Sequence, residues 1–194
     1  LTAKELNKTF FEIIIAPSFD GGALSLFSKK KNLRVLSLSG YKPKKAFGKD
    51  IAGGMVVQDT DLSVLKTKKL ETVTKKRPTK TQLLTLSLAW KTVKHAKSNA
   101  VVVAHNKKVI SISGGQTSRV DAVKYALTKT DIPPGSVVAS DAFFPFRDSV
   151  DLMQKYKIGA IIQPGGSIKD QEVIGACNEH GISMVFTSLR VFKH

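Results

Sequence analysis

Apolar residues along the chain alternate between short continuous runs and longer stretches in which they recur every three or four positions. The continuous runs are rich in β-branched residues, as in Ile13–Ala16, which Pro17 ends, and this composition is typical of buried strands. The periodic stretches are typical of amphipathic helices, as in residues 81–96, where Leu84 and Leu88 share a face. This alternation predicts an α/β fold in which helices are layered on a mixed sheet.

Side chains that can cap a helix mark the starts of three predicted helices. Asp20, Thr81 and Ser118 each stand at the head of a periodic stretch and can accept a hydrogen bond from its first turn. The predicted helices cover residues 2–11, 21–28, 81–96, 118–130, 148–156 and 170–179. The predicted strands cover residues 13–16, 33–38, 55–58, 100–104, 108–112, 137–139, 160–162 and 183–186.

A polar and basic stretch, residues 65–80, divides the chain and contains Pro78. No aromatic residue is interleaved among its basic ones, so it lacks the stacking side chains of an RNA-binding segment. We interpret it as a solvated linker. Residues 81–194, whose strands and helices follow the order β-β-α-β-α-β-α-β after a first helix, are predicted to form one layered domain. Residues 1–64 form a separate part.

The composition bounds the class of protein. Hydrophobic residues make up 42% of the 194, enough to fill a core. The 31 basic and 15 acidic residues leave a net charge of +16, which implies an anionic partner such as nucleic acid, a phosphorylated metabolite or an acidic surface.

The single cysteine, Cys177, excludes an internal disulfide and favours a reducing compartment. No apolar run approaches the roughly 20 residues of a membrane-spanning helix. The chain lacks an initiator Met, so we expect a fragment or a processed chain.

Polar residues and glycines gather at two predicted strand boundaries in the middle of the chain. The side-chain amide of Asn99 can donate to and accept from a planar carboxamide or formyl group, although its spacing alone favours an ordinary helix end and turn. The paired glycines of the segment 113–119 allow backbone N–H groups to approach a ligand closely. Arg119, on the first helical turn, could hold a phosphate or carbonyl oxygen, and a tight strand-to-helix turn is the plain alternative.

Three later segments also follow predicted strands. Residues 140–148 place three phenylalanines around a proline beside charged residues, which favours an aromatic wall for a planar ligand over a core cluster. The Gly-rich segment 163–168 ends the next strand, so both loops should open on the same edge of the sheet. The segment 188–190 follows the last strand and adds a cation, Arg190.

Several common catalytic motifs are missing. The HxE and PCxxC pair of zinc deaminases, the GxSxG of hydrolases and the GxxxxGK[ST] phosphate loop do not occur. The four histidines lack metal-ligand spacing. Lys94 and His95 are neighbours on a predicted helix and point about 100° apart, so we assign them to the helix surface.

The residues of these loops resemble those of the bifunctional purine enzymes that have AICAR transformylase and IMP cyclohydrolase activities. The likeness runs through nearly the whole chain, and the aromatic loop followed by the Gly-rich loop and a terminal R-x-F-K-H is its most specific part. The segments that carry it are IIIAPSFDGGAL, VKHAKSNA, GGQTSRVDAV, SDAFFPFRDSVD, IIQPGGSIKDQEVI and NEHGISMVFT.

The resemblance implies a formyl transfer from 10-formyltetrahydrofolate to the amine of AICAR, a purine-precursor ribonucleotide. It implies AICAR contacts at Asn99, Arg119 and Arg190, with Asn99 orienting the reacting groups and Arg190 holding the phosphate. It implies folate contacts at Val120, Phe143, Phe146, Ser167 and Ile168.

The same resemblance implies a fold of two cytidine-deaminase-like units without zinc, so that residues 1–64 are the end of the first unit and residues 81–194 are the second. It further implies a cytoplasmic homodimer with active sites between subunits, and no membrane or nucleic-acid partner. The family's Lys-His pair lies in a K-H-x-x-P-C-G motif that this chain does not contain, and Lys94-His95 has different neighbours. We therefore expect the base that removes the proton from the attacking amine, and the cyclohydrolase part, to lie outside this chain.

Two other functions are compatible with the residues. One is a basic nucleic-acid-binding module, which the clustering of the aromatics in one loop with Asp141 and Asp148 weakens. The other is a catalytically inactive scaffold or dimerisation subunit that has kept the fold and lost the base.

Overall fold

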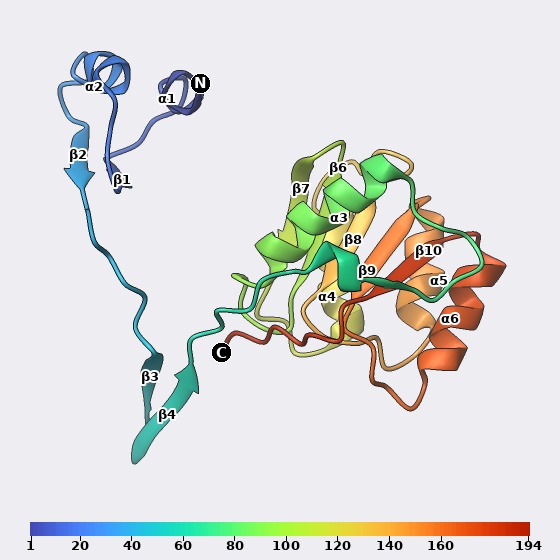
Figure 1. Cartoon of the computed structure of the whole chain (residues 1–194). Coiled ribbons are helices and arrows are strands. Elements are labelled where there is room, and N and C mark those ends of the chain that lie inside the picture. The colour runs from blue at the N-terminus through green and yellow to red at the C-terminus, as the bar shows by residue number, and fades with distance from the viewer. The chain divides into compact units, whose positions relative to one another are not determined.

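The computed structural model describes all 194 residues and divides into two compact units, residues 1–60 and residues 61–194 (Figure 1). Each unit has its own hydrogen-bonding pattern, and each is described by itself. None of the helices combines the length and the apolar character that a membrane-crossing helix requires.

The first unit contains a small α/β motif and a hairpin. In the motif, helix α1 (Thr2–Leu6) leads to strand β1 (Ile13–Ala16), and helix α2 (Gly21–Phe27) leads to strand β2 (Arg34–Ser37), which pairs with β1 in parallel. The hairpin joins β3 (Ala46–Ile51) to β4 (Gly54–Asp59).

The cap and both strands of the α/β motif lie where the sequence predicts them, and other features differ. Asp20 caps α2 by accepting a hydrogen bond from the backbone N–H of Ala23 at 2.6 Å. The predicted burial of β1 is wrong, because Ile13 and Ile15 are about half exposed (48% and 58%). The first helix ends at Leu6 rather than near residue 11.

Strand β3 was not predicted, since it mixes charged residues with Gly48 and has no clear apolar alternation. Its glycine has a steric role. A Cβ atom at Gly48 would lie 2.5 Å from Sδ of Met55, a residue of the opposite strand. A glycine that weakens the strand pattern in the sequence therefore makes room for a cross-strand side chain.

The second unit is built on a six-stranded mixed sheet with the order β5-β10-β9-β8-β6-β7. Strands β8, β9 and β10 run parallel, β6 runs antiparallel to both β7 and β8, and β5 runs antiparallel to β10. The strands are β5 (Glu71–Thr72), β6 (Val101–His105), β7 (Lys108–Ser113), β8 (Val137–Ser140), β9 (Ala160–Gln163) and β10 (Ser183–Phe186). The predicted mixed α/β sheet is thus confirmed.

Helices cover both faces of this sheet. Helices α4 (Arg119–Thr128), α5 (Asp148–Lys155) and α6 (Asp170–Glu179) share one apolar cluster with one face, and α3 (Lys80–Val93) shares a second cluster with the other face. Successive residues of β6 alternate between the two clusters, so that Val101 faces one and Val102 the other. A sheet buried on both faces explains why its strands are continuous apolar runs in the sequence.

The cap of the long helix in the second unit lies two residues earlier than predicted, and the helix ends at Val93 rather than near residue 96. Thr79, not Thr81, is the cap, and it forms a reciprocal capping box in which its hydroxyl accepts from the N–H of Gln82 and Gln82 Oε1 accepts from the N–H of Thr79. Ser118 caps α4 as predicted, accepting from the N–H of Asp121 at 3.1 Å.

Part of the stretch 65–80, interpreted above as a linker, lies in the sheet. It contains a 3-10 turn, η1 (Thr67–Lys69), and the two-residue strand β5, which pairs with β10. Leu65 is 8% exposed and belongs to the α3 cluster. The hydroxyl of Thr74 accepts from the N–H of Met184 at 2.9 Å, so residues far apart in sequence hold this stretch in place.

The thiol of Cys177 has no exposed surface, and burial raises its pKa to about 12. Because only the thiolate reacts, we expect a disulfide reagent at mildly alkaline pH to label the folded protein no faster than the protein unfolds, and to label one thiol per chain in concentrated urea. A Lys155→Cys substitution, at an exposed position of α5, supplies the control that reacts at once. Rapid labelling of Cys177 in the folded protein would contradict its burial.

Candidate functional site

Five polar segments of the second unit meet at one edge of the sheet. The loops 141–147, 164–169 and 187–190 follow the carboxyl ends of the parallel strands β8, β9 and β10. The segment 98–100 enters β6 and the segment 114–118 leaves β7, and both lie at this edge because β6 runs antiparallel to its two neighbours. The prediction that the loops open on the same edge is confirmed, and this edge is where α/β sheets bind ligands.

A buried carboxylate lies at the centre of this edge. Asp141 has no exposed surface, and its Oδ1 forms an ion pair with Nη1 of Arg119 and accepts from the N–H of Ala100 at 3.1 Å. Its Oδ2 accepts from the hydroxyl of Ser98. A charge at this depth requires partners of this kind, since an unpaired carboxylate would be strongly destabilised.

Arg119 lies in the site, and most of its guanidinium is used within the protein. The residue is 7% exposed. Besides the ion pair with Asp141, its Nη1 donates to the backbone oxygen of Ala100 at 3.0 Å and its Nη2 donates to Oδ1 of Asn99 at 2.9 Å. The guanidinium therefore points into this network, where it holds Asn99 and Asp141 in place. Few of its N–H donors remain for a ligand.

Asn99 is fixed by the segment beside it as well as by Arg119. Its Nδ2 donates to the backbone oxygens of Gln116 at 3.0 Å and Thr117 at 3.3 Å. The backbones of Asn99 and Gln116 also exchange two hydrogen bonds, of 3.2 and 3.3 Å. Both amide N–H donors are thus engaged, and one lone pair of Oδ1 remains beyond the bond from Arg119.

Next to this network, at the same sheet edge, is an open cavity of about 380 Å³. The residues that line it come from three segments that are far apart in the sequence: the aromatic loop, the Gly-rich loop and the segment after the last strand. Its lining residues are Phe143, Pro164, Gly165, Gly166, Ser188 and Arg190. One aromatic ring, one cation, one serine hydroxyl and exposed backbone are the groups that this cavity offers to a ligand.

The Gly-rich loop depends on a residue without a side chain. Gly165 has a φ of +75°, and a Cβ atom there would lie 2.5 Å from Cδ2 of Phe186. Only glycine combines this left-handed backbone with such a close approach to an aromatic ring. Gly165 therefore sets the course of the loop along the cavity.

The C-terminal tail joins the cavity to the polar network. The N–H of Val191 donates to the backbone oxygen of Asp141 at 3.0 Å, and Ser98 exchanges two hydrogen bonds with the backbone of Lys193, of 2.9 and 3.2 Å. The guanidinium carbon of Arg190 lies 5.2 Å from the ring centroid of Phe192, within the range of a cation–π contact. The C-terminal tail thus fixes the position of Arg190, the one cation among the residues that line the cavity.

Four further residues expected in the site do not line this cavity. Phe146 is about half exposed and Ile168 is fully exposed. The hydroxyl of Ser167 accepts from the N–H of Lys169 at 3.1 Å, and Val120 is partly buried on the first turn of α4.

Lys94 is the C-cap of α3 and His95 follows it. His95 is exposed, as expected for a helix surface, but the side chain of Lys94 is only 11% exposed and has a structural role, so its assignment to the surface is wrong. Its ammonium donates to the backbone oxygen of Ser63 at 2.6 Å and lies 3.3 Å from Asp61. Burial raises the pKa of Asp61, but hydrogen bonds from Ser63 and the charge of Lys94 outweigh it, so the pKa lies below its ordinary value. Lys94 therefore anchors residues 61–63 to the helix.

The central role of Asp141 was not predicted from the sequence, in which this residue stands out only as a charge beside the phenylalanines. The available signal was its place directly after a strand that is buried on both faces, where a carboxylate has to find a cationic partner.

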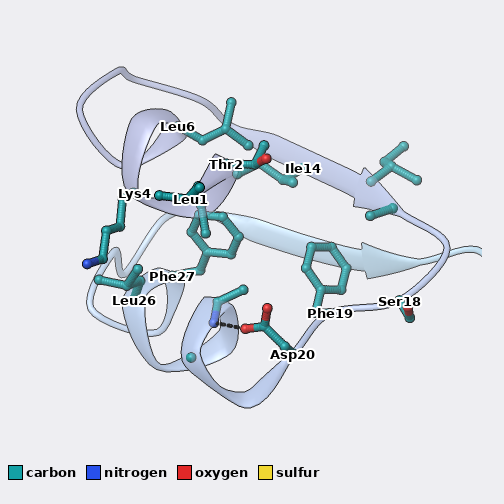
Figure 2. Close-up of a pocket in the computed structure, with 15 residues that line it drawn as sticks. Leu1, Thr2, Lys4, Leu6, Ile14, Ser18, Phe19, Asp20, Leu26 and Phe27 are labelled. Atoms are coloured by element: carbon teal, nitrogen blue, oxygen red, sulfur yellow. Dashed lines mark hydrogen bonds between the residues drawn. The ribbon is translucent and has the colours of Figure 1, made fainter.

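A larger cavity, of about 640 Å³, lies in the first unit between α1, β1 and α2 (Figure 2). Its lining is mainly apolar and includes Phe19 and Phe27, whose rings meet edge to face with centroids 6.2 Å apart. The carboxylate of Asp20 is used as the cap of α2, as the dashed line in Figure 2 shows. Because converging polar groups distinguish a reactive site from an apolar hollow, we place the candidate site at the sheet edge of the second unit.

Comparison with known proteins identifies the class of protein to which this fold and site belong. The sequence profile of the AICARFT/IMPCHase bienzyme family matches residues 1–129. The chain belongs to this family.

Individual relatives are similar over the entire chain. It is 53% identical to the bifunctional purine biosynthesis protein PurH of Aquifex aeolicus and to that of Persephonella marina, and 48% identical to that of Caldicellulosiruptor saccharolyticus. In each case the match covers 100% of this chain and 38% of the relative, so the chain spans well under half the length of these relatives.

One solved structure shows a slight likeness. It is a diaminohydroxyphosphoribosylaminopyrimidine deaminase/5-amino-6-(5-phosphoribosylamino)uracil reductase from Thermotoga maritima, with 18% identity and a TM-score of 0.33 over 52% of this chain and 33% of that one. A likeness of this size does not bear on the fold.

The geometry of the Gly-rich loop leads to a stability prediction. Gly165→Ala forces a side chain into a left-handed backbone against Phe186, so we expect a loss of about 2 kcal/mol or more in the free energy of unfolding. The control is Gly175→Ala within α6, where a Cβ atom meets nothing and a gain of about 0.5–1 kcal/mol is expected. Urea denaturation measures both, and equal stabilities of the two variants would contradict the role of Gly165.

Proposed function

We propose that this chain forms part of an AICAR formyltransferase, which transfers a formyl group from 10-formyltetrahydrofolate to the amine of AICAR during purine synthesis. Two observations together support it best. The chain belongs to the AICARFT/IMPCHase bienzyme family, and the loops that carry the resemblance converge on one sheet edge beside a cavity with an aromatic ring and a cation. This edge contains Asn99, Arg119 and Arg190, the three residues to which the resemblance assigns AICAR contacts.

The proposed reaction needs few groups from the protein. The AICAR amine attacks the formyl carbon, the carbonyl oxygen gains negative charge in a tetrahedral intermediate, and the bond from that carbon to N10 of the folate then breaks. The amine loses a proton to a base, and N10 takes up a proton as tetrahydrofolate leaves. The protein has to bring the two substrates together, orient the amine and supply the base.

On the nucleotide side, Arg190 is proposed to hold the phosphate of AICAR. A guanidinium can bind two phosphate oxygens at once, and the Arg190 side chain is exposed at the cavity. Asn99 is proposed to orient the reacting amine by accepting a hydrogen bond at the remaining lone pair of its Oδ1. Arg119 is proposed to act mainly by holding Asn99, because its own donors are largely used within the protein.

On the folate side, the pterin ring is proposed to lie against Phe143 in the cavity. The exposed side chains of Phe146 and Ile168 are proposed to cover further apolar parts of the same co-substrate, with Ser167 and Val120 at its rim. Burying such exposed apolar surface against an aromatic ligand is favourable.

The remaining parts of the proposal follow the resemblance. The proton acceptor is proposed to be the histidine of the K-H-x-x-P-C-G motif, contributed from outside these 194 residues. The assembly is proposed to be a cytoplasmic homodimer with shared sites and no metal. The mixed sheet of the second unit is proposed to be a cytidine-deaminase-like unit, and the first unit the end of another.

The direct test is a formyl-transfer assay with the native protein that carries this chain, given AICAR and 10-formyltetrahydrofolate. We expect formylated AICAR and tetrahydrofolate to form in equal amounts. Absence of transfer, together with no binding of either substrate by calorimetry, would refute the proposed function. Binding of both substrates without transfer would favour the inactive scaffold.

A single substitution tests the nucleotide side. Arg190→Ala removes a charge-assisted phosphate contact, so we expect the affinity for AICAR to fall by about tenfold to a hundredfold while folate affinity stays within about twofold. Lys124→Ala, which removes an exposed cation from α4, is the matched control and should leave both affinities unchanged. Unchanged AICAR affinity in the Arg190 variant would overturn the assignment of that residue.

A further inference from the structure

Asp141 is a buried charge that connects several segments of the candidate site. Its carboxylate is bonded to Arg119, to the backbone N–H of Ala100 and to the hydroxyl of Ser98. These partners come from the segment that enters β6 and from the first turn of α4. With no exposed surface, the carboxylate cannot touch a ligand, so any effect on a ligand has to pass through its partners.

A chain of hydrogen bonds leads from this carboxylate to the surface of the site. Asp141 and the backbone oxygen of Ala100 hold Nη1 of Arg119, which leaves Nη2 directed at Oδ1 of Asn99 at 2.9 Å. That bond selects one of the two orientations of the Asn99 amide. The same orientation is required by the backbone oxygens of Gln116 and Thr117, to which Nδ2 donates.

We propose that Asp141 is a positioning residue, whose carboxylate fixes the guanidinium of Arg119 and thereby the side-chain amide of Asn99 toward the nucleotide. This inference rests on the proposed function, since it takes AICAR as the ligand of Asn99. A planar guanidinium serves here as a rigid spacer, because two of its ends are held by acceptors and its plane can no longer rotate. Without the charge of Asp141, the guanidinium keeps only the backbone oxygen of Ala100 at Nη1, and its hydrogen bond to Oδ1 of Asn99 loses its fixed geometry.

The first test replaces the charge and keeps the shape. In the native protein, Asp141→Asn should lower AICAR affinity by about tenfold or more, because a mispositioned polar group loses a hydrogen bond worth roughly 1–2 kcal/mol. Folate affinity should stay within about twofold. Asp121→Asn is the matched control: it removes the carboxylate that accepts from Ser118, on the same turn of α4, and should leave both affinities unchanged.

A double-mutant cycle separates positioning from general stability. If Asp141 acts through Asn99, Asp141→Asn should cost AICAR affinity little, less than about twofold, in an Asn99→Ala background, since sites that act in series are not additive. Equal losses in the two backgrounds would show a merely structural role and overturn the proposal.

A ligand-free measurement distinguishes this proposal from the proposed function. The side-chain amide resonances of Asn99 should shift and exchange faster in Asp141→Asn, whether or not AICAR binds. Shifted resonances in a protein that does not bind AICAR would refute AICAR as the ligand and retain the link from Asp141 to Asn99. AICAR binding by the parent protein with unmoved resonances in the variant would refute the link and retain the function.

Asp141→Glu covers the case in which the asparagine variant does not fold. It keeps the charge and moves the carboxylate outward by one methylene, which displaces the guanidinium. A displacement of about 1 Å in a site of this kind can lower turnover by about a hundredfold, so we expect formyl transfer to fall by at least about tenfold. A folded Asp141→Glu protein with the parent's AICAR affinity and turnover would overturn the proposal.

Discussion

The ion pair between Asp141 and Arg119 is the interaction on which the candidate site depends. Both side chains are buried, so each has exchanged water for the other and for neighbouring polar groups. Removing one member of such a pair typically costs about 3–5 kcal/mol, because the other charge is left without compensation. The pair therefore ties the first turn of α4 to the residue that follows β8. Asn99 and the tail that carries Arg190 are bonded to this pair or to its immediate neighbours.

The position of the site follows from how the sheet is covered. Helices lie on both faces, and the interior strands accordingly contain apolar side chains except at their ends, where Ser140, Gln163 and Ser183 lie. Polar side chains can then converge only at the ends of the strands, where loops leave the core. Three parallel strands direct their loops to one edge, and the antiparallel strand β6 brings its entry segment to the same edge. The result is a cavity beside a buried polar network. The network holds the surrounding segments rigid, and the loops form the surface that lines the cavity.

The sequence predicts those parts of the molecule that depend on nearby residues. Strands β6 to β10 and the cap at Ser118 are local patterns, and they lie at or within a residue or two of their predicted places. Strand β5 has only two residues, and its existence depends on pairing with β10 more than a hundred residues later. The side chain of Arg119 likewise points into the protein because of a carboxylate 22 residues away, that of Asp141. A pattern of residue types therefore identifies the arginine but does not predict where its side chain points. The convergence of the loops was predictable from strand order, and the partners within the network were not.

The basic excess of the chain and the specificity of the site are separate matters. The net charge is +16, yet Arg190 is the one cation among the residues that line the cavity. Charges spread over a surface act at a distance, and at an ionic strength of 0.1 M their field is screened beyond about 10 Å. Such a field can raise the rate at which anionic molecules arrive, but it does not orient them. Orientation has to come from groups held in fixed geometry, and in this unit those are the amide of Asn99, held by Arg119, and the guanidinium of Arg190, held by the tail.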